Sequence, residues 1–259
     1  MIYLPHQRAV FVHNPKCAGS SMVAALDQAF PERTRLWGRF YLPQQDLVRD
    51  VSHLRLDEMR QFLPAEQFPV ELTFGVVRDP YTRFASAFKH FKKHSGCDPR
   101  LTVEQFMEQH FNHNTLRTDW RFVHFAPQYT FFFRSNWCCA DLLGRFEALD
   151  EFADTLSARL GKAVKLGNEN VGDAYAIDLS DNAIATINHY YANDFAYFGY
   201  ALRTPTPRAR VLGDQGLYRQ FEALWPVERG LEISAKTLRG TPAADKPASA
   251  ETPQRLRAA

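Results

Sequence analysis

The segment formed by residues 14–21 contains the residue types that bind a phosphate or sulfate group. It reads Asn-Pro-Lys-Cys-Ala-Gly-Ser-Ser and lies between a β-rich run and a helical pattern. Main-chain N–H groups at the start of a helix have no partner within the helix, and the helix dipole places partial positive charge there. Lys16 adds a full positive charge, Gly19 permits close approach of the backbone, and Ser20 and Ser21 supply hydroxyl donors. These features predict an anion-binding loop.

The order of residues in this loop argues against an ordinary ATP or GTP site. In the Walker A pattern the lysine follows the last glycine and precedes the hydroxyl that holds magnesium. Here Lys16 precedes Gly19. The loop taken alone also fits a polar turn that caps a helix and carries an incidental lysine, so a second anion-binding segment is needed to decide between the two interpretations.

A second segment with suitable chemistry begins at Arg78. This residue leaves the end of an apolar run over residues 72–77, and Ser86 follows on the helix predicted to begin at Pro80. In doubly wound sheets, ligands bind at the carboxyl ends of the strands. A guanidinium can form a forked contact with a phosphate, and a serine hydroxyl can donate to the same group. A salt-bridged strand-end arginine and a surface serine are the alternative, which the presence of the Lys16 loop disfavours.

The elements that position these segments follow a strand, loop and helix order twice. The first unit is a strand over residues 9–13 and a helix over residues 20–30, whose apolar residues recur at helical spacing. The second is the strand over residues 72–77 and a helix with Asp79 as its cap and Pro80 in its first turn. This repetition predicts an α/β fold with a central, mainly parallel sheet flanked by helices.

The rest of the sequence predicts further helices and one strand, and its composition changes after residue 203. Helices are expected over residues 103–111, 149–160 and 181–193, the last with Ser180 as its cap, and a strand over residues 129–133. The expected organisation is a catalytic domain over residues 1–203, an extension over residues 204–235 with an amphipathic helix at 217–225, and a disordered tail over residues 236–259.

The composition narrows the class of protein. Of 259 residues, 45% are hydrophobic and 14% aromatic, including 21 Phe, which is enough apolar volume for a buried core. A net charge of +2 argues against a general nucleic-acid or membrane-surface binder. The chain shows no signal-peptide pattern or run of eighteen apolar residues. Cysteines stand at 17, 97, 138 and 139, which fits neither a zinc site nor a disulfide framework, so we expect a cytoplasmic protein with reduced thiols and no metal.

Taken together, the two anion-binding segments resemble the signature motifs of the sulfotransferase superfamily, specifically the branch with the heparan and chondroitin carbohydrate sulfotransferases. The Lys16 loop resembles its 5′-phosphosulfate loop, although Cys17 and Ala18 stand where many relatives carry Thr-Gly. The run from Arg78 to Ser86 has every defining position of its 3′-phosphate motif, RDPxxRxxS. Additional similarity lies in residues 124–128, 145–149 and 191–200, so that the resemblance extends from about Val10 to Tyr200.

The resemblance implies a P-loop-like α/β fold and a donor, 3′-phosphoadenylyl sulfate (PAPS), from which a sulfuryl group passes to a hydroxyl or amine, here of a carbohydrate. Arg78 and Ser86 would bind the donor's 3′-phosphate. Its sulfuryl end would be surrounded by Lys16, Cys17, Ala18, Gly19, Ser20 and Ser21.

The resemblance also indicates the groups that would do chemistry. Lys16 would stabilise the leaving phosphate, and His53 resembles the family's histidine between the two donor motifs, with Ser52 in place of a glycine. A histidine suits the role of base because its pKa lies near neutrality. His124 is the alternative base. The residues expected to line the acceptor cleft are Trp120, Arg121, His124 and Gln128.

Two other functions remain open from the sequence. One is a kinase or related phosphotransferase with a degenerate P-loop, which would require magnesium and ATP. The other is a protein without catalytic activity that binds anions or glycans on the same fold and would bind the nucleotide product without transferring sulfate.

Overall fold

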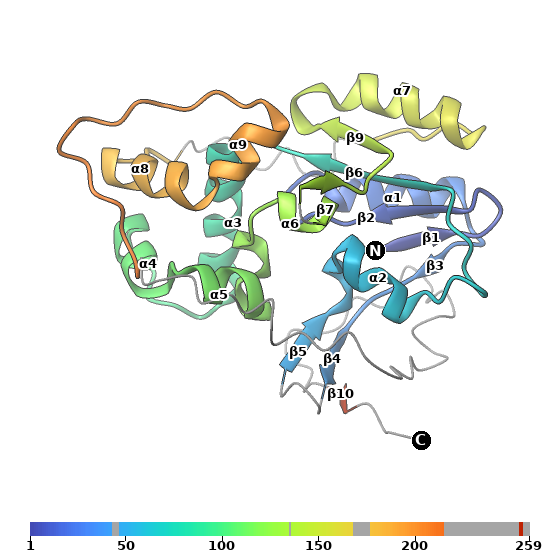
Figure 1. Ribbon diagram of the computed structural model, residues 1–259, viewed down its shortest axis with the longest axis horizontal. Helices are drawn as coiled ribbons and strands as arrows, with labels where there is room; N and C mark the ends of the chain where they lie inside the picture. The colour runs from blue at the N-terminus through green and yellow to red at the C-terminus, as the bar shows by residue number, and fades with distance from the viewer. Residues whose placement is uncertain (43–46, 135, 168–176, 215–253, 256–259) are drawn as a thin grey trace. The chain divides into compact units, whose positions relative to one another are not determined.

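The computed structural model describes residues 1–42, 47–134, 136–167, 177–214 and 254–255. The chain divides into two compact units (Figure 1). Unit 1 contains residues 1–77, 130–171 and 229–259, and unit 2 contains residues 78–129 and 172–228. Each is described by itself.

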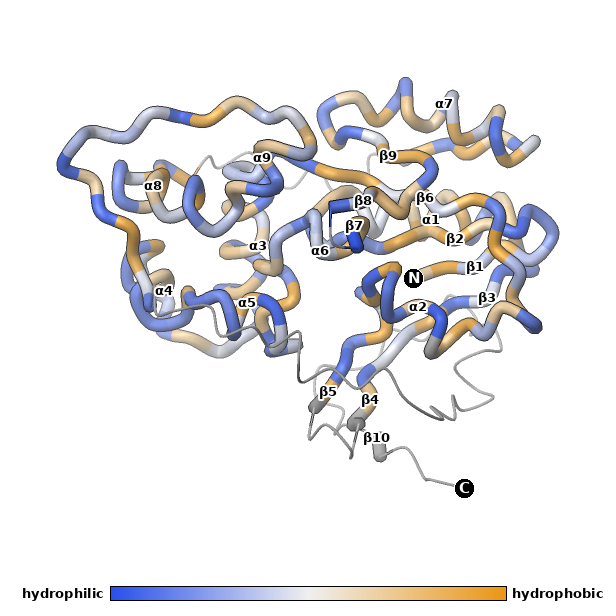
Figure 2. Tube along the Cα trace, viewed as in Figure 1, coloured by the Kyte–Doolittle hydropathy of each residue, from blue (hydrophilic) through white to orange (hydrophobic). Residues whose placement is uncertain are grey.

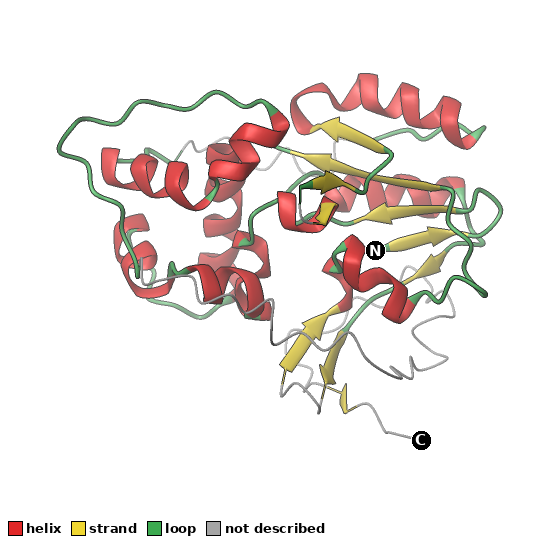
Figure 3. Cartoon of the chain, viewed as in Figure 1, coloured by secondary structure: helices red, strands yellow, loops and turns green. Residues whose placement is uncertain are grey.

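Unit 1 is built on a five-stranded sheet, whose strands are yellow in Figure 3. The central strands β2, β6 and β9 run parallel, and β1 runs antiparallel to β2 and to the edge strand β3. The strand order is β3 (Thr34–Arg35), β1 (Ile2–Leu4), β2 (Ala9–Val12), β6 (Leu72–Val77) and β9 (Leu142–Arg145). The mixed α/β class predicted from the two strand, loop and helix units is confirmed.

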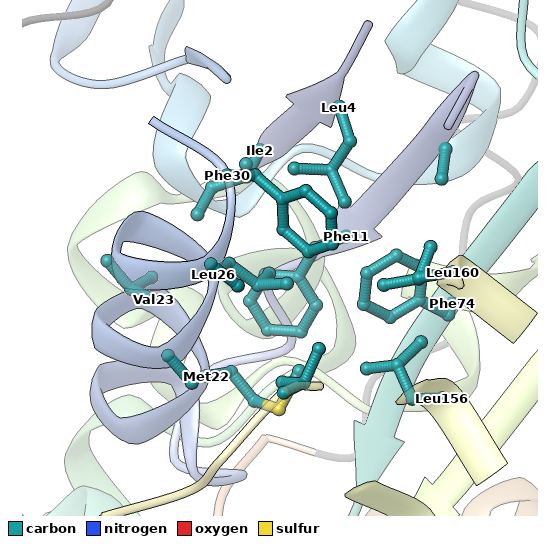
Figure 4. Packing of buried hydrophobic residues seen from close by; sticks show 14 of the residues in the cluster. Ile2, Leu4, Phe11, Met22, Val23, Leu26, Phe30, Phe74, Leu156 and Leu160 are labelled. Atoms are coloured by element: carbon teal, nitrogen blue, oxygen red, sulfur yellow. The ribbon is translucent and has the colours of Figure 1, made fainter. Parts of the chain in front are cut away.

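Helices α1 (Gly19–Ala29) and α7 (Leu149–Leu160) supply apolar side chains to one cluster with the strands. Figure 2 colours β2 and β6 largely as hydrophobic, as expected of strands covered on both faces. Figure 4 shows α1 and α7 side chains meeting strand side chains inside unit 1. Each fully buried Leu, Phe or Met contributes about 1.5–3 kcal/mol of hydrophobic stabilisation. Labelled members of the cluster are Ile2, Leu4, Phe11, Met22, Val23, Leu26, Phe30, Phe74, Leu156 and Leu160.

Side-chain packing on the other face of β6 depends on a glycine. Because side chains alternate along a strand, Gly75 faces away from the side on which Phe74 packs. A Cβ atom on Gly75 would lie 2.5 Å from the Cε1 atom of Phe132, which is inside van der Waals contact. The absence of a side chain at Gly75 therefore lets the Phe132 ring pack directly on the strand.

Several smaller elements complete unit 1. Strands β4 (Arg39–Leu42) and β5 (Leu47–Asp50) pair antiparallel, and the short β10 (Gln254–Arg255) pairs with β4. A 3₁₀ turn, η1 (Val51–His53), and helix α2 (Leu56–Phe62) follow β5. The others are β7 (Phe133–Arg134), β8 (Trp137–Cys138) and η3 (Phe146–Ala148).

Unit 2 is helical around an aromatic core. The rings of Phe106 and Phe125 lie 4.7 Å apart between centroids, and Phe84 contacts both. Such ring pairs stabilise a core beyond their area burial. The elements are α3 (Pro80–His94), α4 (Val103–His110), α5 (His113–Thr118), η2 (Trp120–Phe125), α8 (Asp181–Tyr190) and α9 (Ala192–Phe198), and α6 (Tyr129–Phe132) begins at the last residue before the chain returns to unit 1.

Most predicted helices and caps are confirmed. The Asp79 carboxylate accepts the Thr82 N–H at 2.9 Å, and the Ser180 hydroxyl accepts the Ala183 N–H at 3.3 Å, so both residues cap the helices expected of them. The helix predicted over residues 181–193 ends earlier, at Tyr190, and the separate helix α9 follows it.

The strand predicted over residues 129–133 is wrong, because Tyr129–Phe132 is helical and only Phe133 belongs to a strand. The Asp194 carboxylate accepts the N–H groups of Gln128 and Tyr129, both at 2.8 Å. One side chain thus satisfies two successive N–H groups and starts a helical turn that the aromatic composition did not predict.

The helix predicted over residues 217–225 lies outside the described residues, as does the predicted tail except for residues 254–255. Within the described ranges, no helix has the length and apolarity needed to span a bilayer.

Candidate active site

The loop between β2 and α1 has the backbone geometry of an anion site. Lys16 has φ 64° and Ala18 has φ 57°, so two residues that are not glycine adopt the left-handed conformation. Left-handed residues within a turn direct neighbouring N–H groups toward one concave side. Among the residues that the structure describes, the N-cap residue of α1, Ala18, makes no side-chain cap hydrogen bond, and the first turn of α1 has no acidic residue. The first N–H groups of α1 are therefore oriented for an anion without a competing carboxylate in that turn.

Buried polar contacts hold this loop at the end of the parallel strands. Asn14 is 2% exposed, and its Nδ2 donates to the Val76 carbonyl at 2.9 Å and to the Cys17 sulfur at 3.2 Å. Cys17 is itself buried in the core, so it can contribute only its main chain to a ligand. Ser20 is exposed in the first turn of α1, whereas Ser21 is buried. The loop is a fixed structure at the carboxyl edge of the sheet.

Two hydrogen bonds fix the turn and the ring orientation of His53, the predicted base. It ends the turn η1, which Asp50 caps by accepting the Ser52 N–H at 3.0 Å. The Nδ1 atom of His53 lies 2.8 Å from the His13 carbonyl oxygen. A carbonyl can only accept, so Nδ1 carries the proton, and in the neutral ring Nε2 is the nitrogen that bears the lone pair.

The surroundings of His53 also favour its neutral form. Burial lowers the pKa of His53 below its ordinary value of 6.5, and the charge of Lys16 adds to the lowering, against an opposing effect of Asp50. The structure therefore brings Lys16 and His53, the two predicted catalytic residues, into one electrostatic environment within unit 1. At neutral pH the imidazole is unprotonated, as a base must be.

His13 connects the loop to His53, a role that its sequence position did not predict. Its ring centroid lies 4.4 Å from that of His53, and its ring packs against Gly19 so closely that a Cβ atom there would overlap the imidazole. Gly19 is thus needed for a second reason besides backbone approach. Its lack of a side chain makes room for the residue whose carbonyl orients His53.

In unit 2, the backbone of Arg78 is clamped by Gln128. The Arg78 N–H donates to Oε1 of Gln128 at 2.9 Å, and Nε2 of Gln128 donates to the Arg78 carbonyl at 2.7 Å. The Arg78 side chain donates from Nε to the Thr82 hydroxyl at 3.1 Å. Thr82 and Ser86 lie four residues apart on α3 and so share one side of the helix. The structure places the Arg78 guanidinium on the side of α3 that carries Ser86.

Two residues of the motifs lie in the interior of unit 2. Arg83 is 2% exposed and Asp194 is fully buried. Burial raises the pKa of Asp194 to about 6, although the charge of Arg83 and the N–H groups of Tyr129 and Gln128 act to lower it. The Tyr191 hydroxyl donates to the Phe125 carbonyl at 2.8 Å, and burial raises its pKa strongly.

The residues expected to line an acceptor cleft differ in exposure and in hydrogen-bond partners. Arg121 is exposed and pairs with Asp119 at 2.6 Å. Trp120 and His124 are half-buried on η2. Gln128 is a correction, because it is fully buried and its side-chain amide supports Arg78.

His124 belongs to a histidine cluster that the sequence did not reveal. Its ring centroid lies 4.5 Å from that of His90, which lies 4.4 Å from that of His94. In the described part of the chain, no group of three or more His, Cys, Asp or Glu residues has the arrangement of a metal site, and no disulfide joins the four cysteines.

The comparison with known families agrees with this geometry. A sequence model of the Sulfotransferase family matches residues 1–201. The chain belongs to the sulfotransferase family. The match contains the Lys16 loop, His53 and the segment from Arg78 to Ser86, and it ends just after α9. No curated protein and no solved structure matches this sulfotransferase. The family implies a transferase of sulfuryl groups and is one that generally uses PAPS.

Proposed function

We propose that this sulfotransferase transfers the sulfuryl group of PAPS to a hydroxyl or amine of a carbohydrate. The observation that supports the proposal is the backbone geometry of the two segments: left-handed residues in the Lys16 loop, and two hydrogen bonds between Gln128 and the backbone of Arg78. PAPS has a phosphosulfate at its 5′ end and a phosphate at its 3′ position. The proposal assigns the first to the loop of Lys16 and the second to Arg78 and Ser86.

In the proposed reaction, the acceptor oxygen or nitrogen attacks sulfur in line with the bridging oxygen of the donor. The new bond to sulfur forms as the bond to the bridging oxygen breaks, and 3′-phosphoadenosine 5′-phosphate (PAP) leaves. Lys16 and the first N–H groups of α1 stabilise the negative charge that grows on the leaving phosphate. Nε2 of His53 takes the acceptor's proton, since Nδ1 is engaged with the His13 carbonyl.

The carbohydrate acceptor rests on the resemblance to the carbohydrate branch and on residues of η2. Trp120 offers an aromatic face, and His124 and the exposed Arg121 offer donors. Such groups suit a sugar that carries hydroxyl or anionic substituents. The likeness to P-loop folds rests on the strand, loop and helix order of β2 and α1.

Two titrations separate the proposal from the phosphotransferase alternative. PAP without metal should bind with a micromolar dissociation constant, and ATP with magnesium should bind much more weakly. Tight binding of ATP that requires magnesium, together with no binding of PAP, would replace the proposal with a kinase-like function.

Catalysis is then tested with labelled PAPS and a panel of saccharides. Transfer of label by the wild type, with loss of transfer in His53→Asn, supports the enzyme. PAP binding without transfer to any saccharide would favour the non-catalytic alternative.

A further inference from the structure

A chain of buried hydrogen bonds in unit 2 ends on the backbone of Arg78. Asp194 and Gln128 are both fully buried. The Asp194 carboxylate accepts the Gln128 N–H at 2.8 Å, and the Gln128 amide exchanges two hydrogen bonds with Arg78, at 2.9 Å and 2.7 Å. The chain therefore links α9, the segment before α6, and the first residue after β6.

The two hydrogen bonds between Gln128 and Arg78 do more than provide partners for the buried Gln128 amide. They engage both the N–H and the C=O of one residue, as a neighbouring β-strand would. This fixes the backbone of Arg78 on both sides of its Cα atom and so fixes the direction in which its side chain leaves. Thr82 then restrains the guanidinium through Nε.

A gain in folding stability does not by itself account for these buried hydrogen bonds. Burying an amide and a carboxylate costs free energy that hydrogen bonds only offset, and well-packed apolar residues of similar size are often as stabilising. Consistent with this cost, burial raises the pKa of Asp194 in spite of nearby Arg83 and two N–H donors. What these hydrogen bonds provide is a defined geometry, because they hold a binding group on a fixed backbone.

We propose that Gln128 and Asp194 are positioning residues for the 3′-phosphate subsite, acting through the backbone of Arg78. Gln128 holds Arg78 directly, and Asp194 holds Gln128. The inference rests on the proposed function, since it requires that Arg78 bind the 3′-phosphate.

The test uses discrimination between two ligands, PAP and AMP, which differ by the 3′-phosphate. Gln128→Met keeps the side-chain volume and removes both hydrogen bonds to Arg78. We expect it to weaken PAP about tenfold or more and AMP less than about threefold, the scale for a disturbed charged hydrogen bond. Asp194→Asn should shift the ratio of the two dissociation constants in the same direction. Gln109→Met, at an exposed position of α4, should leave both constants unchanged.

The outcomes are separable. If Gln128→Met keeps its unfolding transition and retains the wild-type ratio of the two dissociation constants, the inference is overturned, because the role is then structural only. If Arg78→Ala itself retains the ratio, the assignment of Arg78 fails, and the proposed function fails with it. Should Gln128→Met not fold, Asp194→Asn takes its place, and an unchanged ratio in that variant refutes the inference equally.

Discussion

His53→Asn removes the proposed base while retaining the contact that holds it. The Nδ2 atom of asparagine occupies nearly the position of Nδ1 in histidine, so it can still donate to the His13 carbonyl, which lies 2.8 Å from Nδ1 in the native protein. No atom replaces Nε2. The turn η1 and its Asp50 cap should therefore remain, and the loss should be confined to proton transfer.

The magnitude follows from the role of a general base. A positioned base contributes about 10²–10⁴-fold to the rate, which corresponds to about 3–5 kcal/mol of barrier. PAP affinity should change less than about threefold, because the anion loop of Lys16 is intact. The wild type should lose kcat/KM as the pH falls through a value below 6.5, since burial lowers the pKa of His53 and only the neutral ring accepts a proton.

The assay is single-turnover transfer from labelled PAPS as a function of pH, with His124→Asn as the matched variant at the alternative base. Near wild-type transfer in His53→Asn would remove His53 from the mechanism. An acid limb well above pH 6.5 would also contradict the account, because it would require a raised pKa.

Three further predictions concern the supports of the site. Gly19→Ala should destabilise unit 1 by about 1–3 kcal/mol and weaken the binding of PAP, because a Cβ atom at position 19 would overlap the His13 ring. A denaturant unfolding curve identical to that of the wild type would contradict this. Ala18→Gly should leave PAP affinity unchanged and alter the free energy of unfolding by less than about 1 kcal/mol. Glycine relieves the strain of the left-handed φ of 57°, and this gain opposes the greater freedom of glycine in the unfolded chain. A much lower free energy of unfolding in the variant would contradict this prediction. Relative to Asp194→Asn, the wild type should gain about 2 kcal/mol of stability as the pH falls from 7 to 4. The carboxyl has a pKa of about 6 in the folded state against an ordinary value of 3.8, so the folded state binds the proton first. A difference in unfolding free energy between the two proteins that does not vary with pH would contradict this.

The sequence predicted those parts of the fold in which local signals agree with tertiary packing. The apolar run of β6, the Asp79 cap and the glycine-containing loop each specify their structure within a few residues, and each is found as expected. The segment Tyr129–Phe132 shows the limit. Its aromatic residues favour a strand, but the acceptor that makes it helical is Asp194, more than sixty residues later in the chain.

For the candidate site, the sequence offered candidates for donor contacts but not the residues that support them. Lys16 and Arg78 were proposed from charge, spacing and resemblance. His13 and Gln128 act through a carbonyl and a pair of backbone hydrogen bonds, and such contacts leave no pattern in a single sequence. The tautomer of His53 likewise depends on a contact forty residues away.

The most direct test of the central claim is calorimetric titration of PAP, without metal, into the wild type, Lys16→Ala, Arg78→Ala and the double variant. Lys162→Ala and Arg208→Ala, at exposed positions, serve as matched controls. The account predicts one PAP per chain, a loss of about 1–3 kcal/mol for each single variant and a larger loss for the double variant. Two PAP molecules per chain, each sensitive to only one of the two substitutions, would show that the segments bind separate anions and would contradict the account.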